Sequence, residues 1–312
     1  MKLIIQIPCY NEEQTLPETI KALPRKIEGI DRIEVLVIDD GSTDRTLETA
    51  KELGIEHIIT FKNNKGLARA FAAGIEKCLE LGADIILNTD GDNQYKGRDI
   101  PKLIKPILNR QADMVIGARQ FHSYSWLKKI LLKLGSKLIS KLTQTNLIDV
   151  ASGLRAYSRE AAFLINTFSD YSYTVENIFQ LNFQKMKIIS VQVEVNKTTR
   201  RSRLIHNLPS YIFKQLAILV RIYTTYKALK VFSLIGLLII FPGFCGFIRF
   251  IWFYFRGEGS GHVQSLIFSA VFIITGILIM TLGILGDVIS NNRKLLEKTL
   301  YQIKKSKYEK NN

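Results

Sequence analysis

Two long apolar stretches near the end of the chain constrain its architecture most. Residues 231–255 contain one charged side chain, Arg249, and residues 265–286 contain none. At about 1.5 Å per residue, each stretch can cross a hydrocarbon layer of ~30 Å as a helix. The connection, 256–264, is short and rich in glycine. The sequence therefore predicts a transmembrane hairpin over 231–287, with both flanking segments on the same side of the membrane.

The charge distribution predicts which side that is. The chain has 43 Lys and Arg against 28 Asp and Glu, a net charge of +15, and basic residues lie on both sides of the hairpin, including a basic tail at 288–312. The positive-inside rule then puts both termini and the N-terminal domain in the cytosol, for a multi-pass protein of the cell membrane. Three widely spaced cysteines imply no disulfide framework and favour a reducing compartment.

Two amphipathic segments are expected, one inside the N-terminal domain, 1–205, and one between that domain and the hairpin. Residues 125–142 combine a stripe of leucines with lysines along its edges, which favours a helix in a membrane interface; packing on a sheet is the competing interpretation. Residues 206–230 are a second, juxtamembrane candidate that continues into the first apolar stretch.

The first 120 residues alternate short β-rich runs with helical patterns, which is typical of a mostly parallel sheet with helices on both faces. The expected strands cover 3–8, 34–39, 55–61, 83–88 and 114–116. The expected helices cover 12–22, a segment capped by Ser42 and Asp44 that runs to Leu53, 65–81 and 99–108.

Acidic residues follow two of these strands. Asp39 and Asp40 end one strand, and Asp90 and Asp92 follow another. Ligands of parallel sheets bind at the carboxyl ends of the strands, so these pairs form a stronger signal together than alone. Two carboxylates and the nearby amide oxygen of Gln94 suit a hard cation, Mg²⁺ or Mn²⁺, of the kind that shares a site with phosphates.

The common phosphate-binding motifs are absent. The sequence has no G-x-x-x-x-G-K-[ST], and no G-x-G-x-x-G follows the first strand. Lys65 and Arg69, at the start of a predicted helix, are candidates for holding a diphosphate through their charge and the helix dipole. A purely structural helix start explains the same residues.

Four motifs together resemble the family-2 glycosyltransferases, whose nucleotide-sugar-binding domain has the GT-A fold. They are Pro8-Cys9-Tyr10-Asn11-Glu12-Glu13, Asp39-Asp40-Gly41-Ser42-Thr43-Asp44, Asn64-Lys65-Gly66 and Thr89-Asp90-Gly91-Asp92-Asn93-Gln94. Three more motifs and the trailing hairpin are similar to the branch that transfers sugars to polyisoprenyl phosphates, such as dolichyl-phosphate mannosyltransferase and undecaprenyl-phosphate glucosyltransferases. These are Gly117-Ala118-Arg119, Ser152-Gly153-Leu154-Arg155-Ala156-Tyr157-Ser158-Arg159 and Arg200-Arg201-Ser202-Arg203-Leu204.

The resemblance implies a role for each matching residue. Asp90, Asp92, Arg119 and Arg155 are expected to be catalytic, and Asp90, Asp92 and Gln94 to hold the metal. The nucleotide-sugar site is expected at Pro8, Tyr10, Glu12, Asp39, Asp40, Lys65, Arg69 and Asp90. The acceptor phosphate is expected at Arg119, Ser152, Arg155, Arg200, Ser202 and Arg203. Arg203 stands where the family usually has a lysine, and the acid of hydroxyl-directed relatives has no clear match; Glu176 is a candidate.

The implied reaction is inverting transfer of a hexose from a UDP-glucose or GDP-mannose type of donor to a polyprenyl phosphate, for cell-surface glycans or protein glycosylation. A lipid phosphate, with a second pKa of about 6, is largely ionised and attacks without a general base. The expected partners are the donor, the lipid acceptor, membrane lipids and, since such hairpins often pack together, a second copy; no nucleic acid is expected.

Two alternatives stay open. One is a family-2 enzyme that acts on a hydroxyl acceptor in polysaccharide synthesis, although the Q-x-x-R-W motif of processive synthases is absent. The other is a non-enzymatic basic protein, anchored in the membrane, that binds anionic lipid or nucleic acid. The second explains the charge but leaves the acids at the strand ends without a role.

Overall fold

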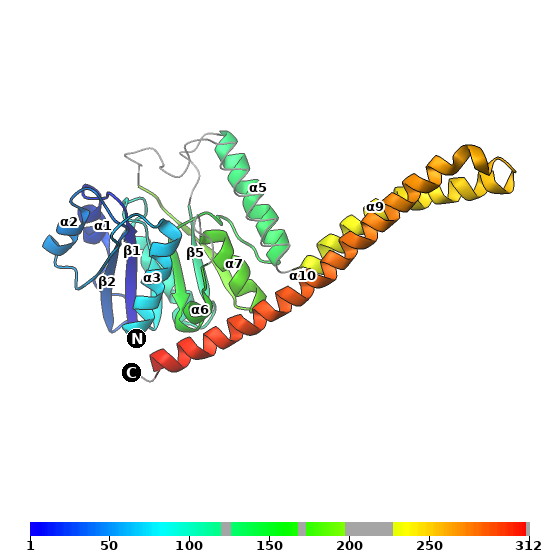
Figure 1. Ribbon diagram of the computed structural model, residues 1–312. Coiled ribbons are helices and arrows are strands. Elements are labelled where there is room, and N and C mark those ends of the chain that lie inside the picture. The colour runs from blue at the N-terminus through cyan, green and yellow to red at the C-terminus, as the bar shows by residue number, and fades with distance from the viewer. Residues whose placement is uncertain (120–125, 168–172, 197–226, 310–312) are drawn as a thin grey trace. The chain divides into compact units, whose positions relative to one another are not determined.

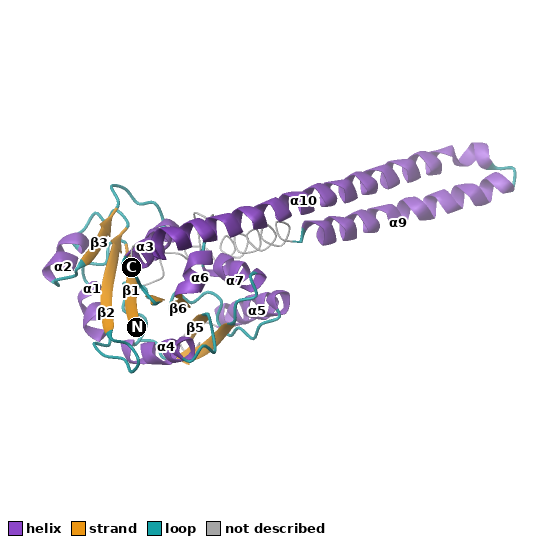
Figure 2. Ribbon diagram, turned by 90° about the horizontal axis from the view of Figure 1, so that it is seen from below, coloured by secondary structure: helices purple, strands orange, loops and turns teal. Residues whose placement is uncertain are grey.

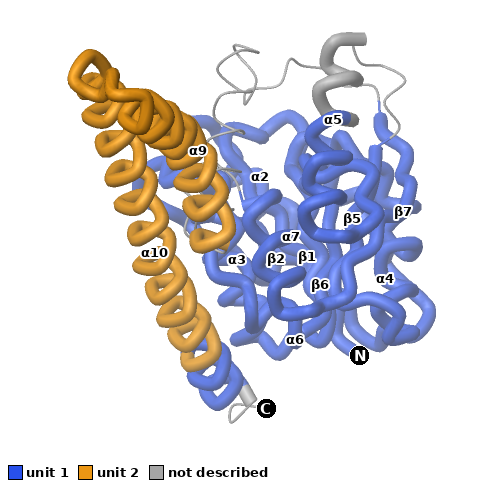
Figure 3. The backbone as a smooth tube through the Cα atoms, turned by 90° about the vertical axis from the view of Figure 1, so that its right-hand side faces the viewer, with its two compact units in different colours: residues 1–201, 300–312 blue, residues 202–299 orange. Residues whose placement is uncertain are grey.

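The computed structural model describes residues 1–119, 126–167, 173–196 and 227–309 (Figure 1). The chain divides into two compact units (Figure 3): residues 1–201 with 300–312, and residues 202–299. Each unit is considered separately below.

The first unit is built on a seven-stranded sheet with the order β3-β2-β1-β4-β6-β5-β7 (Figure 2). The strands are β1 (Lys2–Cys9), β2 (Arg32–Asp39), β3 (His57–Thr60), β4 (Ile85–Asn88), β5 (Met114–Arg119), β6 (Arg155–Ser158) and β7 (Ile188–Val193). Among these strands β6 runs antiparallel to its neighbours β4 and β5, and the other pairs are parallel. The expectation of a mostly parallel sheet is confirmed.

Helices cover both faces of this sheet, because successive strand side chains point to opposite faces. Leu3, Ile5 and Ile7 pack in one buried cluster with residues of α1 (Leu16–Ala22), α2 (Thr46–Glu52) and α4 (Ile100–Leu108). The opposite face, with Gln6, lies against Gly74 of α3 (Leu67–Glu80). Helices α6 (Arg159–Leu164) and α7 (Thr174–Phe183) continue this second layer beside α3.

The strand register brings the ends of five strands to one edge of the sheet. Asn88, the last residue of β4, pairs with Arg155, the first residue of β6, and Ile116 of β5 pairs with the same arginine. The antiparallel strand β6 therefore begins where its parallel neighbours end. The loop before it meets the loops that follow β1, β2, β4 and β5 at that edge.

All five expected strands are present, with shifted ends. The helix expected from residue 12 begins only at Leu16, because Asn11 has a left-handed backbone (φ 55°) and the carbonyl of Glu12 instead closes a turn with the N–H groups of Thr15 and Leu16. The helix expected at 99–108 is α4 preceded by the short helix η1 (Gly97–Asp99). The alternation of β-rich and helical patterns covers only the first 120 residues. It therefore gives no prediction for β6, β7, α6 and α7, which lie beyond them.

A helix is also present where the first amphipathic segment was expected. It is α5 (Trp126–Thr143), whose side chains are described from Leu134 onward. Over this part Ser136, Ile139 and Thr143 are buried, whereas Leu134 and Leu138 are 58% and 42% exposed. One face of the helix therefore packs on the domain and the other carries uncovered leucines. Most of the second amphipathic segment, residues 206–226, lies outside the described residues.

The second unit contains two apolar helices that coincide with the predicted spans. Helix α9 (Ala228–Phe255) and the much longer α10 (Val263–Glu309) are joined through the short helix η3 (Gly259–His262). Both are long and apolar enough to cross a membrane, and only 11% and 17% of their most apolar windows are buried. A helix in the core of a soluble protein would be mostly covered, so this exposure favours a lipid environment.

Small residues line the contact between these two helices. A Cβ atom at Gly243 would lie 2.9 Å from the Cβ atom of Phe272, and one at Gly283 would lie 2.9 Å from that of Phe232. Along α10 the buried positions Ser269, Gly276 and Gly283 follow one another at intervals of seven. Such spacing keeps one narrow face of α10 against α9, with the two backbones close together.

The expected basic tail, 288–312, does not begin a new element. Helix α10 continues through it to Glu309, and residues 300–312 belong to the first unit. There the hydroxyl of Tyr301 donates to Glu160 of α6 at 2.5 Å, and the Nζ of Lys304 donates to the carbonyl of Ile165 at 3.0 Å. The end of α10 is thus packed and hydrogen-bonded as part of the first unit.

Candidate active site

The turn after β4 carries the two acids predicted to bind metal. The hydroxyls of Thr15 and Thr19, both at the start of α1, donate to the carbonyl of Gly91 at 2.9 and 3.1 Å. A Cβ atom at Gly91 would lie 2.8 Å from the Sγ of Cys9, so only glycine fits between β1 and this turn. These contacts fix the backbone between Asp90 and Asp92.

The carboxylate of Asp90 faces the loop before β6. A Cβ atom at Gly153 would overlap both of its oxygens, so the Asp90 side chain lies directly on the Gly153 backbone. Burial and the charge of Asp92 raise the pKa of Asp90 to about 7, while Arg119 and Arg155 act in the opposite direction. A carboxylate that is buried beside a second acid in this way favours a bound cation or a shared proton.

The donor set fits a divalent metal of the hard type. Asp90 and Asp92 offer carboxylate oxygens, and the Asp92 Oδ1 also accepts the backbone N–H of Gln94 at 3.1 Å. The side-chain oxygen of Gln94 accepts from Nη1 of Arg119 at 3.3 Å, so this predicted ligand also touches a predicted acceptor-binding residue. Oxygen ligands of this kind suit Mg²⁺ and Mn²⁺.

A buried polar network supports the loop that Asp90 touches. The side-chain amide of Asn88 donates to the carbonyl of Gly153 at 2.8 Å and to the hydroxyl of Tyr173 at 2.9 Å. Asn88 in turn accepts from Gln6 at 2.9 Å, and the Tyr173 ring stacks on Phe71 with a centroid distance of 3.8 Å. Because buried polar groups are costly to leave unpaired, this network holds the loop in one position.

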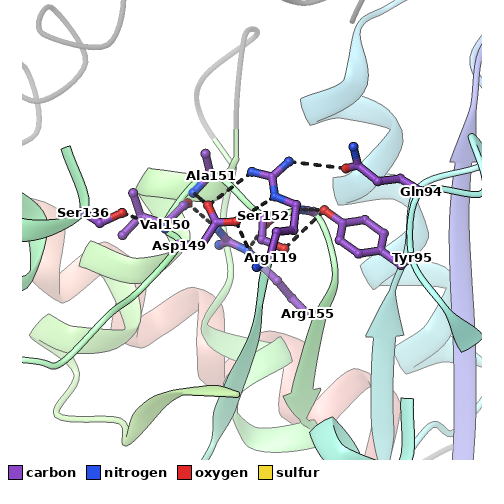
Figure 4. A network of polar contacts seen from close by, with 10 residues as sticks. Gln94, Tyr95, Arg119, Ser136, Asp149, Val150, Ala151, Ser152 and Arg155 are labelled. Carbon is purple, nitrogen blue, oxygen red and sulfur yellow. Dashed lines mark hydrogen bonds and ion pairs between the residues drawn. The ribbon is translucent and has the colours of Figure 1, made fainter. Parts of the chain in front are cut away.

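Arg119 is the last residue of β5, and its side chain lies between Gln94 and Asp149 (Figure 4). Its Nε and Nη2 donate to the two carboxylate oxygens of Asp149, at 2.7 and 3.2 Å. This is a bidentate ion pair, the strongest arrangement that an arginine and a carboxylate form. Asp149 is completely buried, and the Arg119 side chain is 12% exposed.

The loop that follows Asp149 contains two more of the predicted acceptor-binding residues. The Ser152 hydroxyl lies 3.2 Å from that of Tyr95, which also accepts the N–H of Gly153 at 3.0 Å. Arg155 is completely buried, and its guanidinium donates to the carbonyl oxygens of Val150, Ser152 and Thr174 at 2.6–2.8 Å. These three hydrogen bonds are with backbone and fix the shape of this loop, and the guanidinium also lies over the Tyr173 ring, 5.9 Å from its centroid.

The residues predicted to bind the nucleotide sugar follow β1 and β2 at the same edge. Pro8 and Glu12 are buried, and the ring of Tyr10 is exposed at the rim. Asp39 accepts the N–H of Ser42 at 3.1 Å. The loops after β1 and β2 are joined, because the N–H of Asn11 donates to Ser42 and the N–H of Glu12 donates to Thr46.

Asp40 points away from this group, toward the start of α3. Its two oxygens accept the backbone N–H groups of Lys65 and Gly66 at 2.7 and 2.9 Å. Burial raises the pKa of Asp40, and these two bonds partly oppose the rise. The carboxylate therefore fixes the helix start that carries Lys65 and Arg69, whose side chains are exposed. The structure assigns Asp40 contacts with backbone rather than with the open face of the site.

Several residues of the site were not predicted, and others lie outside the described residues. Asp149, Asn88, Tyr95 and Tyr173 were not predicted from the sequence. Asp149 could have been found there, because it is the first acidic residue after a basic run that begins at residue 114. Arg200, Ser202 and Arg203 lie outside the described residues. Asn196 is the last described residue before them in the chain, and its amide donates to the carbonyl of Asn93 at 2.9 Å. Glu176 is buried in the first turn of α7.

Solved structures of known proteins share the fold of the first unit. The glucosyl-3-phosphoglycerate synthase of Mycobacterium tuberculosis, solved with Mn²⁺, UDP and glucosyl-3-phosphoglycerate, has a similar fold, with a TM-score of 0.57 and 20% identity over 71% of this chain and 79% of that one. The same enzyme solved with Mg²⁺ and UDP gives a TM-score of 0.55, at 20% identity over the same shares of the two chains.

Two archaeal sequences are more similar. An uncharacterized protein of Methanocaldococcus jannaschii is 37% identical over 169 residues, which cover 52% of this chain and 66% of that protein. The UDP-N-acetylglucosamine–dolichyl-phosphate N-acetylglucosaminyltransferase of Methanococcus voltae is 34% identical over 177 residues, which cover 50% of this chain and 68% of that protein. The first relative is thus matched over slightly less than two thirds of its length.

The family described as glycosyl transferase family 2 matches residues 4–163, which include most of β1, all of β2 to β6 and both acids of the predicted metal site. Since this match covers half of the chain, the chain belongs to glycosyl transferase family 2.

Proposed function

We propose that this glycosyltransferase moves a sugar from a nucleotide donor to a polyprenyl phosphate, with inversion at the anomeric carbon, at the cytosolic face of the membrane. The observation that carries the proposal is the position of Arg119. It contacts Gln94 beside the Asp90–Asp92 turn, in a chain with two exposed apolar helices. A cation beside a metal-binding turn suits an anionic acceptor better than a neutral hydroxyl.

The relatives support both substrates. One relative is named as transferring N-acetylglucosamine from a UDP donor to dolichyl phosphate, and the structures of similar fold contain UDP. We therefore propose a UDP-linked sugar, glucose or N-acetylglucosamine, with GDP-mannose as the alternative donor. Pro8, Tyr10, Glu12 and Asp39 would form the nucleotide pocket, and Lys65 and Arg69 lie where α3 begins.

Asp90, Asp92 and Gln94 would hold Mg²⁺ or Mn²⁺. When bound, such an ion neutralises charge on the diphosphate leaving group. The chain's own residues supply the rest of the arrangement: the Gly153 backbone limits where the Asp90 carboxylate can move, and Thr15 and Thr19 hold the turn through the Gly91 carbonyl.

The acceptor phosphate has to be oriented toward the sugar, but it does not need a base to remove a proton. A phosphate monoester is mostly ionised at neutral pH, so its oxygen can attack the anomeric carbon directly. Arg119 and the Ser152 hydroxyl would bind that phosphate, together with Arg200, Ser202 and Arg203. Arg155 would act through the loop that it holds. Glu176 is proposed to have no role as a base in this reaction.

The membrane would supply the acceptor. Leu134 and Leu138 lie one turn apart on α5 and are exposed together with Lys137 and Lys141. Leucines beside lysines suit a helix at the level of the lipid headgroups. With α9 and α10 spanning the bilayer and the basic segments on the cytosolic side, a polyprenyl phosphate could stay in the membrane while the soluble donor binds from the cytosol.

The test is sugar transfer by the full chain in detergent or lipid vesicles. Radiolabelled UDP-glucose, UDP-N-acetylglucosamine and GDP-mannose are each supplied with undecaprenyl phosphate and Mn²⁺. We expect one donor to give a labelled product that is soluble in organic solvent, that is lost with EDTA, and whose sugar is β-linked. A labelled polymer soluble in water, or no dependence on the lipid phosphate, would contradict the proposal.

Two variants locate the reaction. Asp92→Asn replaces one of the proposed carboxylate ligands by a neutral amide, which holds a divalent cation more weakly, and is expected to lower transfer by about a hundredfold or more. Asp84→Asn is the matched control, since Asp84 precedes β4, at the opposite edge of the sheet from Asp92, and accepts the backbone N–H of Lys2 at 2.7 Å. Equal activity in the two variants would mean that Asp92 is not a metal ligand.

A further inference from the structure

Asp149 makes a two-pronged contact with Arg119, a residue expected to bind substrate. Both of its oxygens are occupied by Arg119, and the Oδ1 also accepts the N–H of Ala151 at 3.2 Å. The Arg119 backbone N–H donates to the same carboxylate at 3.3 Å. One completely buried acid thus connects the end of β5 to the loop that carries Ser152.

This contact determines how the guanidinium is turned. Arginine has five N–H donors in a rigid planar fork. Asp149 takes the edge formed by Nε and Nη2, and Nη1 then points toward Gln94. A long flexible side chain that is held along one edge keeps its other edge in one orientation, and little side-chain entropy remains to be lost when a ligand binds.

We infer that Asp149 is a positioning residue, which fixes the Arg119 guanidinium so that its Nη1 side faces the acceptor phosphate beside the Asp90–Asp92 turn. This inference rests on the proposed function, since it assumes a phosphate acceptor. It assigns no chemical step to Asp149. The acid acts through Arg119 and through the Ser152 loop, which would supply a hydroxyl to the same phosphate.

Net charge alone predicts the opposite change in the acceptor KM when Asp149 is replaced. The experiment can therefore contradict the inference. Asp149 neutralises Arg119, and removing that negative charge would strengthen the attraction of the site for an anion. If charge governs acceptor binding, an uncharged residue at 149 should lower the acceptor KM. If orientation governs it, the same substitution should raise the acceptor KM, despite the gain in positive charge.

The experiment measures transfer by the full chain as a function of undecaprenyl phosphate and, separately, of the nucleotide sugar. Asp149→Asn keeps an oxygen for the Ala151 N–H but cannot accept from both Nε and Nη2 of Arg119. We expect its acceptor KM to rise at least about tenfold, with the donor KM unchanged within about twofold. Asp84→Asn, at the opposite edge of the sheet, is expected to change neither KM.

Arg119→Lys completes a double-mutant cycle. Lysine keeps the charge but has no fork to orient, so Asp149→Asn should cause little further loss in the Arg119→Lys background. Should Asp149→Asn not fold, as judged by Mn²⁺-dependent UDP binding, Asp149→Glu keeps the charge but displaces the guanidinium, and the same selective rise in acceptor KM is expected.

The outcomes separate the two claims. If the wild-type chain forms no lipid-linked product, the proposed function is overturned and this inference falls with it. If the wild type forms it, an acceptor KM that is unchanged or lowered in Asp149→Asn overturns the inference alone. Equal rises in both KM values, or additive losses in the cycle, would give Asp149 a general structural role and also overturn it.

Discussion

The backbone of Gly153 lies against the carboxylate of Asp90, closer than any residue with a side chain would permit. The carbonyl of the same glycine is held by Asn88, the last residue of β4, at 2.8 Å. The loop before β6 thus limits how far the Asp90 carboxylate can move toward the sheet. The position of that loop is in turn fixed by β4, the strand that precedes Asp90.

Substituting Gly153 by alanine should therefore impair the metal site in particular. The added methyl group would overlap both Asp90 oxygens and push the carboxylate away from its present position. We expect Gly153→Ala to weaken Mn²⁺-dependent UDP binding by about tenfold or more, measured by calorimetry on the full chain in detergent.

Gly135→Ala is the control for this substitution. Gly135 lies in α5, where a Cβ atom would meet nothing within 4 Å, and alanine is favoured there as a helix former. The control should bind UDP as the wild type does. If Gly153→Ala also binds UDP normally, Asp90 has room to relax, and the close contact does not shape the metal site.

The part of this site that could be predicted from sequence depends on local patterns. Asp39 and Arg119 end strands and Asp90 follows one. Parallel strands end at a common edge, so the proximity of these residues follows once the alternation of strands and helices is recognised. The two hairpin helices could also be predicted from a local pattern, because the length of an apolar stretch is enough to identify them. Their predicted limits lie inside α9 and α10.

The rest depends on register and packing, which the sequence does not display. The partner of Arg119 is Asp149, 30 positions away, and their meeting requires β6 to pair antiparallel with β5. Arg155 and Asp40 look like surface charges in the motifs, yet burial turns both toward backbone groups. Helix α10 continues past the apolar stretch because no proline or glycine interrupts residues 287–309.

A second prediction concerns Glu34 on β2, the strand between β1 and the edge strand β3. Its side chain is 3% exposed and pairs with Lys2 at 2.9 Å, Arg32 at 2.6 Å and His57 at 3.0 Å. Glu34, Glu56 and His57 have the spacing of a metal-binding group, but Lys2 and Arg32 already supply positive charge there. Burial alone would raise the pKa of Glu34; the hydrogen bonds from Lys2 and His57 outweigh it and lower the pKa.

A lowered pKa means that ionised Glu34 stabilises the fold above its unfolded value of 4.5, and that this contribution is lost as the pH falls through the folded-state pKa. Glu34→Gln should thus cost about 2 kcal/mol at neutral pH and progressively less below that value. Unfolding temperatures of both proteins across the acid range check this. A difference that stays constant with pH would contradict the assignment.

A third prediction concerns the contact between Tyr301 on α10 and Glu160 on α6. The hydroxyl donates to the carboxylate at 2.5 Å, and the Tyr301 ring meets Phe163 edge-on at a centroid distance of 6.1 Å. Tyr301→Phe keeps the ring contact and removes the hydrogen bond. In a cycle with Glu160→Gln, we expect a coupling energy of about 1 kcal/mol in the unfolding of the first unit.

Lys298→Ala provides the comparison for that cycle. Lys298 is an exposed residue of α10, and its substitution should be additive with Glu160→Gln. Additive effects for Tyr301 and Glu160 as well would mean that the end of α10 does not stabilise the first unit through this bond, and the helix would then be attached through its apolar contacts.

The last prediction tests the packing of the hairpin. A Cβ atom at Gly276 would lie 2.7 Å from the carbonyl oxygen of Gly236 and would overlap Ile240, so a valine there must push the two helices apart. Overpacking of this kind costs about 1–3 kcal/mol. We expect Gly276→Val to lower the midpoint of thermal unfolding, followed by circular dichroism in detergent, whereas Leu278→Val, at a position that is 60% exposed, should leave it nearly unchanged. If the two valines lower the midpoint equally, the loss comes from the helix propensity of valine, and the small residues do not set the distance between α9 and α10.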